Sequence, residues 1–232
     1  ANERFPADFI EENLSIQNNV IGAAFSTGVQ NLIFLGSSCI YPRDCPQPIK
    51  EQYLLDGPLE PTNRAYAVAK IAGIEACWAH NRQHGTRYIA VMPTNLYGPG
   101  DNYDLETSHV LPALIRKVHE AKQRKLSEVS VWGTGLAWRE FLYSDDLAGA
   151  CIFLLDRSTE DLGQLFSNHY PPLVNIGMGT ELQIHELVSK IIKVVGYNGT
   201  VQWDQSRPDG TPRKLLDSSL ISSFGWKAST QL

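Results

Sequence analysis

A tyrosine and a lysine four residues apart are the first pair in the sequence whose types and spacing could do chemistry. They lie in the run Tyr66-Ala-Val-Ala-Lys70, inside a predicted helix. Positions i and i+4 share one face of a helix. A lysine ammonium beside a phenol lowers the tyrosine pKa, so Tyr66 could exchange a proton with a substrate oxygen near neutral pH. By itself the spacing also fits an ordinary exposed helix face.

A hydroxyl group follows a predicted buried strand. Residues 29–35 form a short apolar run that ends at Gly36-Ser37-Ser38, as is typical of a strand in a parallel sheet. Such sheets bind ligands outside the carboxyl ends of their strands. Together with Tyr66 and Lys70, Ser37 could bind a carbonyl group, protonate it and hold a ribose. A serine at this place is equally typical of a turn.

The elements that must position these residues alternate between helices and strands. Apolar spacing and Gly or Pro boundaries predict helices over residues 7–27, 64–83, 111–125, 145–155 and 181–195. Strands are predicted over residues 29–35, 87–92, 129–132 and 173–176. Residues 42–63 are rich in proline and are predicted to form a long surface loop. The alternation predicts an α/β fold with a parallel sheet and crossover helices.

Composition narrows the class of protein. With 232 residues, 43% of them hydrophobic, the chain suits one large α/β domain, or one domain with an attached lobe. A net charge of −5 argues against a nucleic-acid partner. Because no apolar run reaches ~18 residues and no signal peptide is visible, we expect no membrane partner. The four cysteines lack CxxC spacing, so we expect no metal site, reduced thiols and a cytoplasmic protein.

Longer runs of sequence resemble a known family. They are Gly-Ser-Ser-Cys-Ile-Tyr-Pro over residues 36–42, Glu-Pro-Thr-Asn-x-x-Tyr-Ala-x-Ala-Lys over 60–70, and Met-Pro-Thr-Asn-Leu-Tyr-Gly-Pro over 92–99. Shorter matches include Ser108-His109, Trp132-Gly-Thr-Gly, Arg139-Glu-Phe-Leu and Pro208-Asp209-Gly-Thr-Pro-Arg-Lys214. Over about residues 5–227 the chain resembles the extended short-chain dehydrogenase/reductase family, and within it the epimerase-reductases that make GDP-L-fucose.

The resemblance implies a Rossmann-like, doubly wound parallel sheet with a smaller C-terminal α/β substrate-binding lobe. It assigns residues 1–104 and 145–178 to the NADP-binding domain, and residues 105–144 and 179–232 to the nucleotide-sugar-binding lobe. Family members open with a strand-Gly-x-x-Gly-x-x-Gly-helix segment that holds the cofactor pyrophosphate. That segment is absent from this sequence. We therefore expect the N-terminal strands to be missing from this chain, which alone would bind NADP poorly. The family also implies a homodimer, with the helices at 7–27 and 64–83 packed as a four-helix bundle.

The implied reaction inverts C3 and C5 of GDP-4-keto-6-deoxy-D-mannose and then reduces its C4 ketone with NADPH. The ketone acidifies the C3 and C5 protons because the carbanion delocalises as an enolate. The resemblance assigns Cys39 as the base and His109 as the acid; both residue types titrate near neutrality when perturbed. Ser37 and Tyr66 would bind the C4 oxygen, and Tyr66 would donate the final proton. Lys70 would bind the nicotinamide ribose and lower the Tyr66 pKa.

The remaining candidates are binding residues. For NADP(H) the resemblance implies Leu35, Gly36, Ser37, Ser38, Tyr66, Lys70, Pro93, Thr94, Asn95, Leu96 and His109. For the GDP-sugar it implies Asn95, Val110, Lys117, Trp132, Arg139, Asp209 and Lys214. Arg139 and Lys214 can neutralise a diphosphate. The family often has arginine where Lys117 stands, and lysine keeps the charge without the bidentate geometry.

Two other interpretations stay open. A nucleotide-sugar 4-epimerase or 4,6-dehydratase would share the fold, but such dehydratases carry an Asp-Glu pair where Cys39-Ile40 stands here. An inactive scaffold is expected to have lost Ser37, Tyr66 or Lys70, and all three are present. Outside the matched motifs, a lone cysteine is usually a small buried hydrophobe and a histidine before a helix an ordinary helix-start residue. The roles of Cys39 and His109 therefore depend on the motifs around them.

Overall fold

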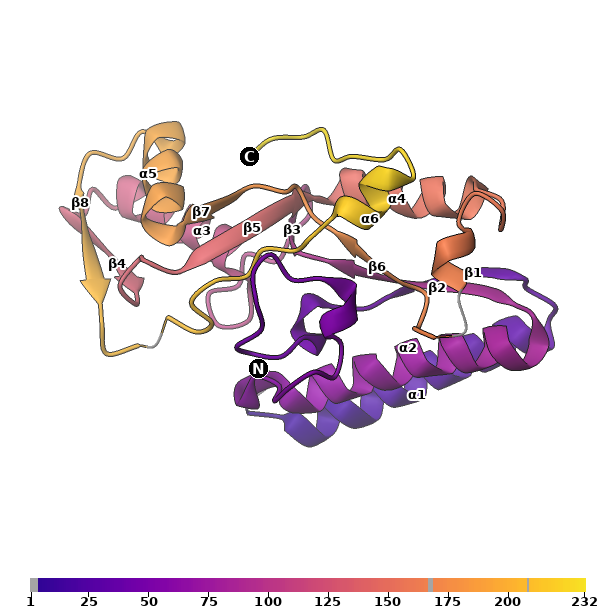
Figure 1. The fold of residues 1–232 in the computed structure, drawn as a ribbon. Helices are drawn as coiled ribbons and strands as arrows, with labels where there is room; N and C mark the ends of the chain where they lie inside the picture. Colours follow the sequence, from indigo (N-terminus) through magenta and orange to yellow (C-terminus); the bar gives the residue numbers. More distant parts are fainter. Residues whose placement is uncertain (1–3, 167–168, 208) are drawn as a thin grey trace.

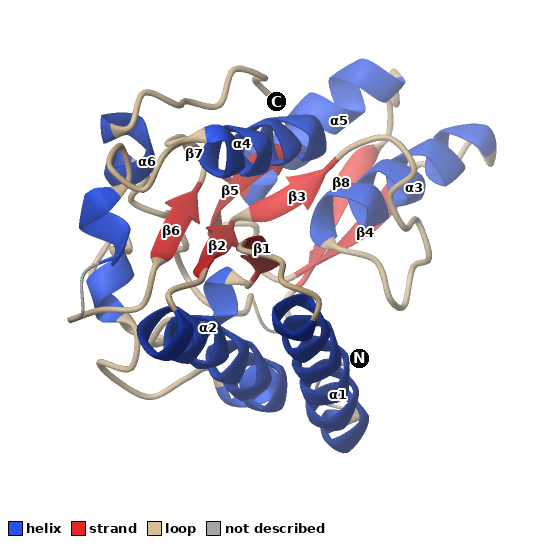
Figure 2. Cartoon of the chain, turned by 90° about the vertical axis from the view of Figure 1, so that its right-hand side faces the viewer, coloured by secondary structure: helices blue, strands red, loops and turns tan. Residues whose placement is uncertain are grey.

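The larger part of the molecule is built on a parallel sheet. The computed structural model describes residues 4–166, 169–207 and 209–232, so Pro208 of the last motif lies outside the described residues. The sheet has the strand order β1-β2-β6, formed by β1 (Asn31–Leu35), β2 (Arg87–Pro93) and β6 (Leu173–Ile176). Helices α1 (Pro6–Ser26) and α2 (Arg64–His84) cover one face, and α4 (Ser144–Asp156) and α6 (Ser219–Ser223) the other (Figure 2). The predicted α/β fold with a doubly wound parallel sheet is confirmed.

The central strand explains why a continuous apolar run forms this sheet. Every side chain from Tyr88 to Met92 is at most 1% exposed, because helices cover both faces of β2. Burial on both faces removes the alternating pattern that a half-exposed strand shows. After α2, the chain reverses at Gly85, whose φ of +69° lies in the left-handed region. Helices α1 and α2 lie side by side (Figure 1). Gln17 of α1 is buried and donates to the Ala69 carbonyl of α2 at 2.7 Å, which joins the two helices.

A smaller lobe lies at the far end of the molecule from the C-terminal ends of the helix pair (Figure 1). It contains α3 (Val110–Gln123), α5 (Ile184–Val195) and a parallel pair of strands, β4 (Glu128–Trp132) and β8 (Thr200–Asp204). A third sheet, in the order β3-β5-β7, connects it to the larger part; its strands are β3 (Asn95–Tyr97), β5 (Trp138–Tyr143) and β7 (Glu181–Gln183). The lobe has its own core, which includes Leu114, Val118 and Leu187.

The segment after β1 crosses the larger part as a long loop that holds three short 3₁₀ helices, η1 (Ser38–Ile40), η2 (Glu51–Tyr53) and η3 (Pro61–Asn63). The last part of the chain returns to this loop, where Ile49 and Leu216 pair as an isolated parallel bridge. Both side chains are about 2% exposed, so the contact belongs to the core. A further 3₁₀ helix, η4 (Gly163–Phe166), follows α4.

Three general features of the described residues bear on function. None of their helices is both long and apolar enough to span a bilayer. No group of three or more His, Cys, Asp or Glu side chains among them could hold a metal ion. The four cysteines are free thiols: Cys39, Cys45, Cys77 and Cys151.

Candidate active site

Ser37 and Cys39 lie directly beyond the carboxyl end of β1. Ser37 has extended backbone angles and caps η1, with its Oγ accepting a hydrogen bond from the Cys39 amide at 3.3 Å. This cap turns the chain sharply after the strand and fixes the hydroxyl beside the thiol. Gly36 precedes them against the side chain of Met92, which occupies the space that a Cβ would need. The turn therefore requires glycine at position 36 and uses the capping side chain at position 37, and it holds Cys39 through its backbone amide.

Tyr66 and Lys70 lie on the first two turns of α2 and face that turn. The Lys70 Nζ lies 5.6 Å from the centroid of the Tyr66 ring and donates to the Leu35 carbonyl at 3.1 Å. The helix therefore carries both side chains to the end of β1. Burial lowers the pKa of Lys70.

The electrostatics of Tyr66 correct one expectation. Burial raises the pKa of Tyr66, the neighbouring Cys39 raises it further, and the Ser37 hydroxyl lowers it. The sequence predicted a pKa lowered by Lys70, but the loss of hydration dominates. The same contacts bring the hydroxyl of Ser37, the thiol of Cys39 and the phenol of Tyr66 together.

The second strand end, after β2, carries Pro93, Thr94, Asn95 and Leu96. Thr94 and Asn95 both donate to the main-chain carbonyl of Glu140 on β5, at 3.2 Å and 2.9 Å. Leu96 is partly buried against the core beneath α4. These residues line the same edge of the sheet as Ser37, because parallel strands end together.

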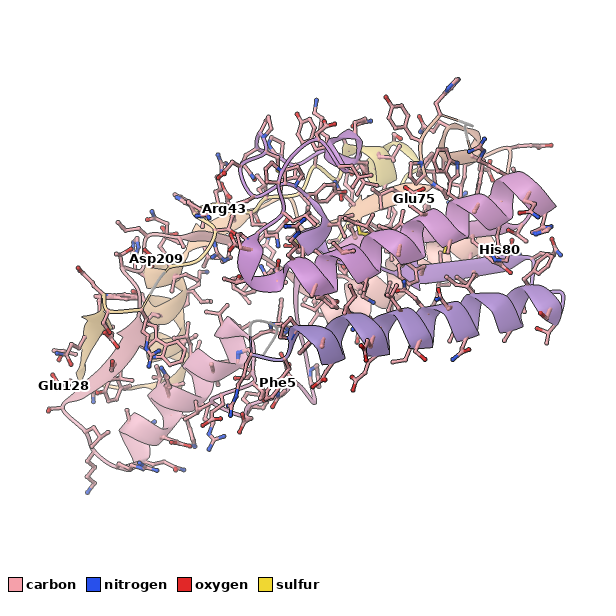
Figure 3. The ribbon with its side chains drawn as sticks, turned by 90° about the horizontal axis from the view of Figure 1, so that it is seen from below. Phe5, Arg43, Glu75, His80, Glu128 and Asp209 are labelled. Carbon is pink, nitrogen blue, oxygen red and sulfur yellow. The ribbon has the colours of Figure 1, made fainter. Side chains whose placement is uncertain are left out.

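A cavity of about 300 Å³ lies in the smaller lobe. Five of the seven predicted GDP-sugar residues line it: Val110, Lys117, Trp132, Arg139 and Asp209. The Lys117 Nζ lies 4.7 Å from the Trp132 ring centroid, a distance at which a cation is attracted to an aromatic face. Asp209 is held at the cavity by the amide and hydroxyl of Thr134, both 2.7 Å from its carboxylate oxygens. Figure 3 shows Asp209 and Glu128 on this lobe.

Three predicted site residues do not line this cavity. Lys214 is 3.8 Å from the sulfur of Cys39 and lies outside the residues that line the 300 Å³ cavity. Asn95 is engaged by Glu140. His109 is exposed at the N-cap of α3, and among the described residues no hydrogen bond or ion pair joins its side chain to Ser37, Cys39 or Tyr66.

The profile of the NAD dependent epimerase/dehydratase family matches residues 1–177. The chain belongs to this family. It is 57% identical to "Probable GDP-L-fucose synthase 1" of Oryza sativa subsp. japonica, over 100% of this chain and 68% of that protein. It is 51% identical to "GDP-L-fucose synthase" of Escherichia coli (strain K12), over 97% of this chain and 70% of that protein.

Solved structures of the family share the fold. A GDP-6-OMe-4-keto-L-xylo-heptose reductase from C. jejuni matches with a TM-score of 0.92 and 38% identity, covering all of this chain and 75% of that one. A GDP-L-fucose synthetase from Naegleria fowleri bound to NADP matches with a TM-score of 0.82 and 28% identity, over 97% of this chain and 70% of that one. The Rossmann-like fold of the family is therefore confirmed for this chain.

Glu140 is the residue of this epimerase/dehydratase chain that sequence reasoning missed. Its side chain is fully buried, with Oε1 accepting from the Gly179 amide at 2.7 Å and Oε2 from the Leu216 amide at 3.1 Å. Burial raises the pKa of this carboxyl, although the amide hydrogen bonds oppose the shift. A charged residue inside the run Arg139-Glu-Phe-Leu was the only signal in the sequence. Glu140 thus joins the end of β2, the turn at Gly179 and the segment at Leu216, which surround the site.

Proposed function

We propose that the protein is a GDP-L-fucose synthase: it inverts C3 and C5 of GDP-4-keto-6-deoxy-D-mannose and reduces the C4 ketone with NADPH. The observation that carries the proposal is the meeting of a thiol, a phenol and a hydroxyl at one strand end, in a chain so similar to proteins named for this synthesis. A phenol and a hydroxyl suit a ketone oxygen, whereas a thiol suits a proton on carbon. A dehydratase is disfavoured because Cys39-Ile40 stands in place of its Asp-Glu pair.

In the inversion, Cys39 takes a proton from the carbon beside the ketone, and the electron pair of that C–H bond moves into an enolate. The negative charge on the C4 oxygen is stabilised by the hydroxyls of Ser37 and Tyr66. His109 returns a proton to the opposite face of the carbon. Because His109 lies at the N-cap of α3 on the smaller lobe, this step needs the sugar to bridge from the strand end to that helix.

In the reduction, bound NADPH supplies a hydride to C4. The residues present fit this cofactor. The Lys70 ammonium has three N–H donors. One of them binds the Leu35 carbonyl, so two remain for ribose hydroxyls. Tyr66 gives its proton to the C4 oxygen, and its raised pKa keeps the phenol protonated at neutral pH. The residues at the ends of β1 and β2 would flank the nicotinamide.

The smaller lobe would hold the nucleotide. Lys117 and Arg139 supply positive charge for the diphosphate, and Trp132 an aromatic face for the nucleoside. We keep the division into residues 1–104 with 145–178 and residues 105–144 with 179–232 as a proposal for the two functional units. A cytoplasmic location is proposed with it, because the substrates are nucleotide sugars.

A homodimer is also proposed, through the outer face of α1 and α2. This face exposes apolar side chains: Ile16 is 64% exposed, Val20 55% and Val68 40%. Pairing two such helix pairs would form a four-helix bundle and bury these groups. Sedimentation of the full-length protein tests the pairing, and Val20→Glu should yield monomers.

The decisive experiment supplies full-length protein with GDP-4-keto-6-deoxy-D-mannose and NADPH and identifies the sugar by NMR. GDP-L-fucose supports the proposal. A product with unchanged configuration at C3 and C5, or no NADPH oxidation, contradicts it. For variants that remove a lysine of the site, Lys193→Met is the matched control, because it removes an exposed lysine of α5.

A further inference from the structure

A lysine from the far end of the sequence lies against the thiol at the end of β1. The Nζ of Lys214 is 3.8 Å from the Sγ of Cys39, across 175 residues of sequence. Both side chains are half-buried and line a small cavity beside the loop that follows β1. The resemblance implies a contact of Lys214 with the diphosphate; its position beside the sulfur supports a second role.

The position of Lys214 is fixed by the backbone that follows it. The Leu215 carbonyl accepts from the Ile49 amide at 2.8 Å, and the Asp217 amide donates to the Ile49 carbonyl at 2.8 Å. The Leu215 amide donates to the Gln47 side chain at 2.9 Å. The Leu216 amide is anchored on the carboxylate of Glu140, and its side chain is 2% exposed. The ammonium is therefore carried on a rigid, partly buried segment.

The two arginines that line this cavity are each paired with a glutamate, whereas the Lys214 ammonium contacts the sulfur. Arg213 is paired with Glu181, its Nε 2.7 Å from the carboxylate, and Arg43 is paired with Glu60 at 3.4 Å. Figure 3 shows Arg43 on the loop near the start of α2. Within the described part of the chain, Lys214 has no carboxylate within ion-pair distance.

The phenols near Cys39 carry no positive charge. Tyr66 approaches from α2, and its raised pKa keeps the phenol neutral at neutral pH. Tyr41 lines the same small cavity and is almost fully buried. Neither can compensate a thiolate electrostatically. Lys214 is the one cation in contact with the sulfur among the described residues.

We propose that Lys214 is a positioning residue for the inversion, which holds Cys39 as the thiolate that removes the proton from carbon. This inference rests on the proposed function. In the step, the C–H bond breaks and its electron pair enters the enolate, while the proton bonds to the thiolate sulfur. The neutral thiol then releases the proton to water. Lys214 takes no proton in this step: its ammonium, 3.8 Å away, stabilises the negative charge on the sulfur, as a cation beside a cysteine does. Reduction by Tyr66 does not use this pair.

Alkylation of the thiol by iodoacetamide measures this directly, since only the thiolate reacts. Full-length protein is alkylated across a range of pH and digested with trypsin, which cuts after Arg43 and so separates Cys39 from Cys45 for mass spectrometry. In Lys214→Met we expect alkylation of Cys39 at neutral pH to slow about tenfold, because the cation 3.8 Å from the sulfur is lost. Lys214→Arg should restore the rate, and Lys193→Met should leave it unchanged. An unchanged rate in Lys214→Met overturns the proposal.

The wild-type protein gives a second test that needs no variant to fold. Burial raises the pKa of Cys45, and the hydrogen bond of Lys214 goes to the sulfur of Cys39. At neutral pH Cys39 should therefore be alkylated faster than Cys45, and the reverse order contradicts the assignment. Deuterium exchange at C3 and C5 of the sugar without NADPH should slow about tenfold in Lys214→Met at neutral pH, in step with the lost thiolate.

The two proposals fail separately. Alkylation of Cys39 involves no sugar. If the protein forms no GDP-L-fucose, the proposed function is contradicted, and alkylation still tests the effect of Lys214 on Cys39. If the protein forms GDP-L-fucose but Lys214→Met does not change the alkylation of Cys39, only the role of Lys214 is refuted.

Discussion

Lys70 links the helix that carries the phenol to the strand that carries the hydroxyl: its Nζ lies 5.6 Å from the Tyr66 ring centroid and donates to the Leu35 carbonyl at 3.1 Å. The two ends of the site are thereby held in register. A change in one of these side chains should alter chemistry before it alters the fold, because none of them belongs to the hydrophobic cores.

Replacing Tyr66 with phenylalanine should lower the rate of reduction by about 10²–10⁴-fold, the usual contribution of a general acid. NADPH oxidation measures this; deuterium exchange at C3 and C5, for which Cys39 and the Ser37 hydroxyl remain, should slow by much less than the reduction. Because the pKa of Tyr66 is raised above its ordinary value of 10.0, reduction by the wild type should fall only on the alkaline side of that value. A loss of reduction between pH 7 and 9 would contradict the role of Tyr66 as the donor.

Replacing Cys39 with serine should slow the inversion while the reduction continues, since a serine hydroxyl is a far weaker base than a thiolate. NMR of the products should then show sugars that were reduced without full inversion. A product distribution equal to that of the wild type would refute Cys39 as the base.

Replacing Lys117 with methionine should weaken binding of GDP about tenfold, because a charge-assisted hydrogen bond contributes about 1.5–3 kcal/mol. Titration calorimetry with GDP measures the change. Lys193→Met, on the exposed side of α5, is the control, and equal affinities in the two variants would remove Lys117 from the nucleotide site.

Replacing Glu140 with glutamine should destabilise the protein by about 1–3 kcal/mol, since the amide nitrogen faces a backbone N–H donor at Gly179 or Leu216. The raised pKa of Glu140 decides how the stability of the wild type changes with pH. Its neutral form contributes fully below the unfolded value of about 4.3, and this contribution is lost as pH rises through the higher folded value. The deficit of the variant in urea unfolding should therefore shrink as pH rises through that window; a deficit that grows contradicts the assignment.

Two helical glycines provide a matched pair for packing. A Cβ at Gly73 of α2 would collide with the Phe34 ring and approach Gln17, whereas a Cβ at Gly22 of α1 has open space. Gly73→Ala should therefore cost about 1–3 kcal/mol by overpacking, and Gly22→Ala should stabilise by about 0.5–1 kcal/mol. Chemical unfolding of both variants checks this, and a stabilised Gly73→Ala would refute the contact.

The sequence predicted the long helices and the buried strands well, because their apolar patterns are strong. The predicted helix at 64–83 is α2 (Arg64–His84), and the run at 87–92 is β2. The helix expected over 181–195 is shorter in the structure, because residues 181–183 form β7. Gln183 is the N-cap of α5 and forms a capping box with Glu186, so the helix starts at Ile184. Strands β3, β5 and β8 were missed: β3 has only three residues, and all of them pair with strands that are far away in the sequence.

The site was predictable to the extent that it is local. Ser37, Cys39, Tyr66 and Lys70 belong to contiguous motifs, and their elements bring them to one strand end. The place of Lys214 could not be predicted, because it depends on the pairing of Ile49 with Leu216. The anchoring role of Glu140 depends on amides from two distant segments. Long-range pairing of this kind leaves no periodic pattern in the sequence.

The bridge between Ile49 and Leu216 has a consequence for synthesis on the ribosome. The thiol leaves the ribosome well before its cation, which is 175 residues behind it in the chain. Since domains form from the N-terminal side as the nascent chain lengthens, the strand, the loop and α2 can assemble long before the ammonium is delivered. A polypeptide arrested between Cys39 and Lys214 would thus lack the cation beside its thiol, and the site would acquire this charge only after the segment that holds Leu216 has paired with the loop.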